Sequence, residues 1–125
     1  MEDYKREFID FMVESIGDEN LKKVTLSSKL VSSSCCLTTQ GGLTLEMEKY
    51  FRNGPSEAMR NLRAERVLEL NGEHRAFKAI KEAYDAGDKD KAAALSKILY
   101  AQAELIAGVE IEDPTTYAEL VTGLF

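Results

Sequence analysis

The sequence predicts a mixed α/β fold of the α+β type, with one small three-stranded sheet and several helices. Three observations lead to this prediction. A chain of 125 residues has the usual length of one domain, so residues 1–125 are expected to form a single unit. Short runs of strand-forming residues occur at 23–26, 35–39 and 66–70. Most of the remaining chain carries apolar residues at helical spacing.

The first forty residues are expected to form a helix followed by two strands. Residues 3–16 have apolar side chains at helical spacing with charged side chains between them, which predicts an amphipathic helix that ends at Gly17. Residues 23–26 alternate between polar and apolar side chains, and residues 35–39 are rich in strand formers. Gly41-Gly42 then ends the second strand.

The middle of the chain returns to helical spacing. Between residues 43 and 52 the apolar side chains recur at i, i+4, i+7 and i+8, and Asn53-Gly54-Pro55 stops this helix. Residues 56–64 are ambiguous and have room for one helical turn. Residues 66–70 form the third expected strand, with Leu68 and Leu70 on one side.

The remainder is predicted to be helical. One helix has Phe77, Ile80 and Tyr84 on a common face and ends near Gly87. A longer helix opens at Asp88 and runs to about residue 107. The last helix starts at Asp113-Pro114, which combines an N-cap acceptor with proline at the first helical position. A helical hairpin is therefore expected at the C-terminal end.

These last two helices are expected to need a partner. A helix of about a dozen residues is marginally stable by itself in water. Two antiparallel helices with wide apolar stripes leave a broad face open, and a second copy could cover it in an intermolecular four-helix bundle. Periodicity alone leaves a second possibility open, in which both stripes pack on the sheet of one chain. The residues expected at the dimer interface are Leu95, Ile98, Leu99, Gln102, Ile106, Tyr117, Leu120, Val121 and Leu124.

The charge of the chain argues against two classes of partner. Lys and Arg number 16 against 22 Asp and Glu, and the formal charge of −6 repels nucleic-acid phosphates and anionic lipids. No segment approaches the roughly 18 apolar residues that span a bilayer, and the start of the chain is acidic where a secretory signal is basic. We expect a cytoplasmic protein with neither nucleic acid nor membrane as a partner.

The reactive residue types form no recognisable catalytic or metal-binding pattern. The only two cysteines, Cys35 and Cys36, are adjacent on an expected strand, so they point to opposite faces and are predicted to be buried, inert thiols. The single histidine, His74, falls near a helix start and is predicted to be a surface or capping residue. Gly41-Gly42 lacks the lysine of a phosphate-binding loop. No catalytic, cofactor-binding or metal-binding residues are predicted.

Several segments, in their order along the chain, resemble one protein family. "DENLKKVTLSSKL" (residues 18–30) with the following "SSSCCLTT", "LTLEMEKYF" (43–51) and "VLELNGEH" (67–74) are similar to the C-terminal domain of bacterial-type ninety-kilodalton heat-shock chaperones. "LYAQAELIAGVEIEDPTTYAELV" (99–121) resembles the terminal hairpin of that domain. The sequence departs from the pattern at Gly72, where the family usually has proline.

The resemblance implies a homodimerisation domain from a longer, ATP-dependent chaperone of the stress response. ATP and Mg would bind to an upstream domain of the parent chain, and this segment would not itself be an enzyme. The resemblance also implies that the helix at 43–52 projects into the cleft of the dimer and contacts unfolded client proteins. A stand-alone adaptor that binds a partner helix in an apolar groove is the alternative. The residues implied in client binding are Leu43, Met47, Tyr50 and Phe51.

Overall fold

The computed structural model describes residues 2–30 and 32–125 and contains a three-stranded mixed sheet with six helices in that part of the chain. The predicted α+β class is confirmed. The elements are, in order, α1 (Glu2–Ile16), β1 (Leu21–Leu26), β2 (Cys35–Gln40), α2 (Leu45–Phe51), α3 (Glu57–Arg60), β3 (Glu65–Leu70), α4 (Arg75–Asp85), α5 (Lys89–Ala107) and α6 (Pro114–Thr122).

The last strand in sequence, β3, is the centre of the sheet. It pairs in parallel with β1 and antiparallel with β2, which gives the order β1-β3-β2. Arg66, Leu68 and Leu70 are the buried residues of β3, as the period of two requires for one face of a strand. The sequence placed Leu68 and Leu70 on a common side correctly, but the burial of Arg66 beside them was not anticipated.

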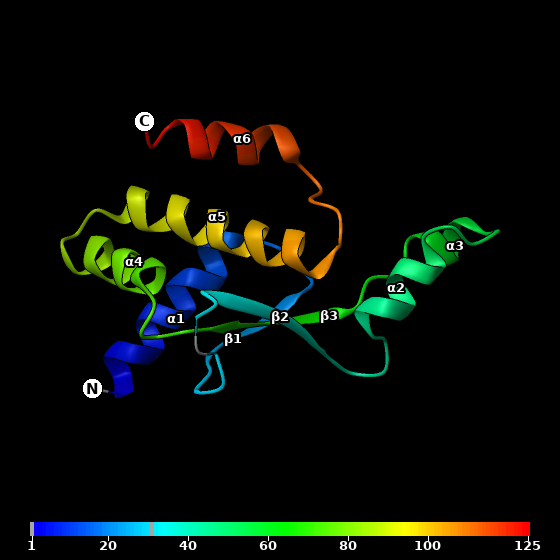
Figure 1. Ribbon diagram of the computed structural model, residues 1–125, viewed down its shortest axis with the longest axis horizontal. Helices are drawn as coiled ribbons and strands as arrows, with labels where there is room; N and C mark the ends of the chain where they lie inside the picture. The colour runs from blue at the N-terminus through cyan, green and yellow to red at the C-terminus, as the bar shows by residue number, and fades with distance from the viewer. Residues whose placement is uncertain (1, 31) are drawn as a thin grey trace.

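Helices α1, α4 and α5 pack together over the sheet (Figure 1). Their shared core contains Phe8 and Met12 of α1 and Ile80 of α4, all at most 2% exposed. The Phe8 ring packs edge-on against Phe77 at 5.6 Å and tilted against Tyr84 at 5.0 Å. The amphipathic stripes predicted for α1 and α4 are therefore confirmed as core, and they hold the sheet from one side.

Capping residues set the helix ends that the sequence predicted. Gly17 and Gly108 adopt the left-handed conformation, at φ +69° and +78°, directly after α1 and α5. The side chain of Asp88 accepts a hydrogen bond from the Lys91 amide at the start of α5. His74 caps α4, because its Nδ1 accepts from the amide of Ala76. The predicted capping role of His74 is thus confirmed.

Two parts of the chain lie outside this core. Helices α2 and α3 form an arm that projects from one end of the sheet, and α6 returns antiparallel to α5 on the side away from the sheet (Figure 1). The C-terminal hairpin is confirmed, and the ambiguous stretch at 56–64 contains the short helix α3. Cys35 is buried as expected, whereas Cys36 is only half-buried, because it points to the sheet face that the helices do not cover.

Candidate functional site

The projecting arm, defined as residues 43–63, exposes apolar side chains to solvent. Met47 is 40% exposed, Tyr50 77% and Leu62 42%, while Leu43 and Phe51 are half-buried. The Tyr50 and Phe51 rings contact each other edge to face at 5.7 Å. The four residues expected to bind clients therefore do not belong to the hydrophobic core of the chain.

The start of α2 differs from the prediction. The helix begins at Leu45, because the hydroxyl of Thr44 accepts a hydrogen bond from the Met47 amide at 3.1 Å and acts as the N-cap. Leu43 consequently lies before the helix and not on its apolar stripe. Ser56 caps α3 in the same way through the Met59 amide, so both short helices of the arm have polar caps.

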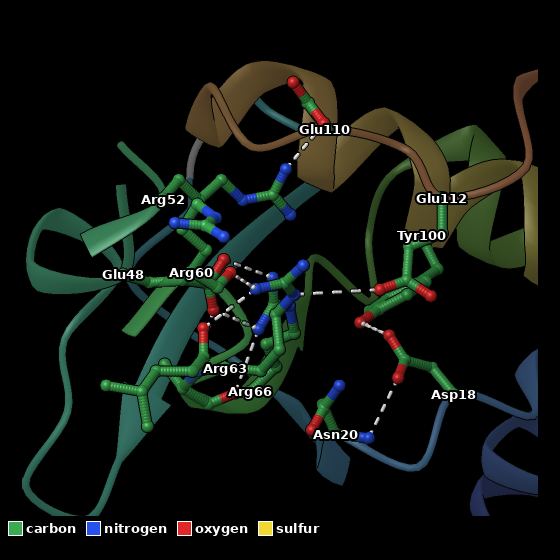
Figure 2. A network of polar contacts seen from close by, with 12 residues as sticks. Asp18, Asn20, Glu48, Arg52, Arg60, Arg63, Arg66, Tyr100, Glu110 and Glu112 are labelled. Atoms are coloured by element: carbon green, nitrogen blue, oxygen red, sulfur yellow. Dashed lines mark hydrogen bonds and ion pairs between the residues drawn. The ribbon is translucent and has the colours of Figure 1, made fainter. Parts of the chain in front are cut away.

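A buried ion pair joins the arm to the sheet (Figure 2). Glu48 of α2 and Arg66 of β3 are 0% and 3% exposed and form two parallel hydrogen bonds of 2.8 and 2.9 Å. The Ala64 amide donates a third bond to the Glu48 carboxylate at 2.7 Å. Burial by itself would raise the pKa of Glu48, but these hydrogen bonds hold that pKa below its usual value. The arm is therefore fixed at its base by a charged pair.

The same arginine faces acidic and aromatic groups of the body. The Tyr100 hydroxyl of α5 donates to Asp18 at 2.5 Å (Figure 2), and burial together with this bond raises the pKa of Tyr100. Glu104, one turn further along α5, is 7% exposed. Burial raises the pKa of Glu104 to about 7, and the negative charge of Asp18 adds to the shift while Arg66 opposes it. A polar network thus extends from the arm to α5.

Sequence reasoning missed this network. Glu48, Tyr100 and Glu104 are ordinary surface residue types in a helical pattern, so periodicity gave no reason to single them out. Arg66 offered the one available signal, since it shares the i, i+2, i+4 positions of β3 with Leu68 and Leu70. A charged residue on the apolar face of a central strand predicts a buried partner.

The residues of α5 that were expected at a dimer interface differ in how far they are exposed. Leu99 is 3% exposed and belongs to the core of its own chain, and Leu95 packs against that core. The Leu99 side chain is thus already covered within its own chain. Ile98 is 7% exposed but lies outside the main core cluster. Gln102 is exposed, and Ile106 is 73% exposed.

Helix α6 has apolar residues but no buried side chain. Tyr117, Leu120 and Val121 are half-buried, Leu124 is 49% exposed and Phe125 is fully exposed at 100%. A pocket of about 830 Å³ lies between α6, α5 and the loop before β1, with Tyr117 and Leu120 among its lining residues. The contact between α6 and its own chain is therefore shallow, and its apolar stripe is incompletely covered.

Metal binding and membrane insertion are two other functions to which the structure is relevant. Within residues 2–30 and 32–125, His, Cys, Asp and Glu side chains do not gather into any group able to hold a metal ion. In the same part of the chain, no helix has the length and apolar character needed to cross a bilayer.

Comparison with known proteins identifies the family. The sequence profile of the family described as Hsp90 protein matches residues 1–125, the whole of this chain. The chain belongs to the Hsp90 family. Its Hsp90 relatives include the chaperone protein HtpG of Clostridium acetobutylicum, 40% identical over 119 residues, and that of Halalkalibacterium halodurans, 39% identical over 116 residues. HtpG of Alkaliphilus metalliredigens is 39% identical over 112 residues.

These matches cover nearly all of this chain but little of the relatives. The alignments include 95%, 93% and 90% of the chain, in the order given, and 18%, 18% and 17% of the respective HtpG proteins. The chain therefore spans less than a fifth of the length of the Hsp90-family chaperones that it matches. The resemblance inferred from the sequence motifs is confirmed at the level of the family.

Proposed function

We propose that this chain is the C-terminal domain of an ATP-dependent Hsp90-type chaperone, in which it joins two protomers and contacts client proteins. The observation that carries the proposal is the uncovered apolar surface of the α5–α6 hairpin, where Ile106 is 73% exposed, Leu124 is 49% exposed and no side chain of α6 is buried. A nine-residue helix is too short to persist in water without packing. We therefore expect another polypeptide to pack against the exposed apolar side chains of this hairpin.

A second copy of the hairpin is the occupant that fits this surface. Two hairpins related by a two-fold axis present the same stripe to each other, and together they form a four-helix bundle. Because Leu99 is in the core and Leu95 and Ile98 are mostly covered, the centre of the proposed interface shifts toward the end of α5 and along α6. It comprises Gln102, Leu105, Ile106, Tyr117, Leu120, Val121 and Leu124.

The arm is the proposed contact for clients. Met47 and Tyr50 are exposed side by side on α2, with the Phe51 ring against Tyr50, and Leu43 lies just before the helix. Methionine and aromatic side chains adapt to irregular apolar partners, which suits unfolded segments of varied sequence. The buried Glu48–Arg66 pair keeps this surface extended from the body, since it fixes the root of the arm.

The remaining parts of the activity are assigned to the parent chain. Hydrolysis of ATP with Mg would take place in a domain upstream of this one. Dimerisation here would tether two such domains, so that their association becomes intramolecular and proceeds at high effective concentration. The domain itself contributes connection and client contact, and no chemical step is assigned to it.

Sedimentation equilibrium tests the dimer. The wild-type chain of 13.9 kDa is expected to sediment as a species of twice that mass. The double variant Ile106→Ser and Leu120→Ala is expected to shift toward monomer, because a two-fold interface loses each side chain twice. The control is Leu62→Ser, which alters an exposed leucine of the arm. A wild-type monomer at the highest concentrations, or a double variant that dimerises like the control, would contradict the proposal.

A further inference from the structure

The base of the arm carries a concentration of positive charge in an otherwise acidic chain. A pocket of about 440 Å³ lies between the arm and the segment that links α5 to α6. Its charged lining consists of four basic side chains and a single carboxylate, in a chain whose formal charge is −6. Arg52, Arg60 and Arg63 gather in this region (Figure 2). The charged lining residues are Lys49, Arg52, Arg60, Arg63 and Glu110.

The acidic partners of these cations are held loosely. Arg52 pairs with Glu110 at 2.6 Å, and Lys49 pairs with Glu46 at 3.2 Å, but the two carboxylate side chains are 80% and 84% exposed. Pairs of this kind contribute little to stability and exchange readily with solvent or another anion. The local positive charge is therefore available to a ligand, in contrast to the charge of Arg66, which a buried carboxylate satisfies.

One buried donor in the pocket lacks an acceptor. The Nε of Arg52 is buried and has no hydrogen-bond partner. A guanidinium offers five N–H donors in a rigid fork, and the only side-chain acceptor of Arg52 among the described residues is Glu110. The Lys49 ammonium lies against Gly108, where an added Cβ would come within 3.2 Å of Nζ. The cations thus come from α2 and from the segment around α3, and they converge beside the end of α5.

We infer that this pocket binds a small, multiply charged anion of phosphate chemistry. Tetrahedral phosphoryl oxygens match the planar fork of arginine, and the volume suits a compact anion. The bound anion would take the place of the Glu110 carboxylate on Arg52 and join the end of α2 to the arginines around α3. Because the Arg52–Glu110 pair connects the arm to the segment that leads into α6, occupancy would release that connection. This site is separate from the apolar surfaces assigned to dimer and client contact.

Titration with sodium tripolyphosphate at constant ionic strength tests the inference. Calorimetry measures the affinity, and the amide chemical shifts of residues 108–110 report where the anion binds. Wild-type chain is expected to bind saturably at one site per chain. Arg52→Gln is expected to weaken binding at least about fivefold, the scale of one charge-assisted hydrogen bond from a partly exposed group. Arg6→Gln, the same charge change on an exposed position of α1, is the matched control and should bind as wild type.

Two further variants keep the result decisive. Lys49→Gln removes a second cation of the pocket and should also weaken binding, and circular dichroism checks that the variant keeps its helix content. Glu110→Gln removes the competing internal carboxylate and should tighten binding severalfold. Equal binding by Arg52→Gln and Arg6→Gln, or weaker binding by Glu110→Gln, would overturn the site. Equal affinity for citrate, which has similar charge, would overturn the assignment to phosphate chemistry.

Discussion

The arm and the α5–α6 hairpin both expose apolar side chains, but they are held in opposite ways. The arm is fixed to the sheet by Glu48 and Arg66, a pair that is almost completely buried and makes paired hydrogen bonds. Helix α6 has no comparable anchor, because none of its side chains is buried. An apolar surface can stay exposed when its root is anchored, whereas a short helix without an anchor depends on further packing for its stability. The difference predicts distinct responses to mutation.

Breaking the anchor of the arm should give the largest effect. Glu48→Gln leaves the Arg66 guanidinium buried without a counter-charge, which costs about 3 to 5 kcal/mol in folding free energy. Urea unfolding followed by circular dichroism measures it. Glu46→Gln on the same helix is the matched control, since that side chain is 84% exposed and should change stability by less than about 0.5 kcal/mol. Equal stability of the two variants would show that the pair does not hold the arm.

A core substitution on α5 should separate folding from association. Leu99→Ala is expected to lower the free energy of unfolding by about 2 to 5 kcal/mol, because it leaves a cavity in the core of its own chain. Ile106→Ser, seven residues further on, should hardly alter the stability of the separated subunit but should weaken the dimer. Denaturation at several protein concentrations distinguishes the two. If Leu99→Ala weakened the dimer without lowering the stability of the separated subunit, Leu99 would belong to the interface.

The buried carboxylate of α5 should make stability depend on pH. Because the folded pKa of Glu104 is raised to about 7, the folded state holds its proton more tightly than the unfolded state, and stability falls as the pH rises from about 4.5 through 7. Glu104→Gln should match wild type near pH 5 and exceed it by roughly 1 to 2 kcal/mol near pH 8. Parallel stability profiles for the two proteins across this interval would argue against the shift.

The smallest effect on stability is expected at the tip of the arm. Met47→Ser combined with Tyr50→Ser should change the unfolding free energy by at most about 1 kcal/mol, roughly 0.5 for each exposed side chain. Capture of an unfolded client, measured as suppression of its aggregation, should decline markedly. Thr115→Ser, on exposed α6, serves as a control. A steep loss of stability without a change in client capture would mean that these side chains pack as core.

The sequence predicted the elements that depend on local signals. Helix caps such as Asp88, Gly108 and Asp113 act through adjacent backbone groups, and the period of two in β3 follows from strand geometry. Helix α5 shows the limit of this reasoning. Apolar and small residues occur on nearly all of its sides, so spacing alone could not tell that Leu99 faces inward and Ile106 faces outward.

Local sequence patterns also could not predict contacts between residues that are far apart in the sequence. Glu48 and Arg66 are 18 residues apart in sequence, and only the path of the chain through α3 brings their charges together. The basic pocket has the same origin, since it combines residues of the arm with the segment after α5. Resemblance to the chaperone family supplied the order of the elements, but it gave no account of these contacts.

Hydrogen exchange of α6 as a function of protein concentration tests the central claim most directly. If a second chain covers the apolar stripe of α6, the amides of residues 115–122 should become more protected as concentration rises through the dimer dissociation constant, while those of β3 keep a protection set within the subunit. Protection of α6 that is strong and independent of concentration would mean that its own subunit suffices, and the proposed role in dimerisation would be contradicted.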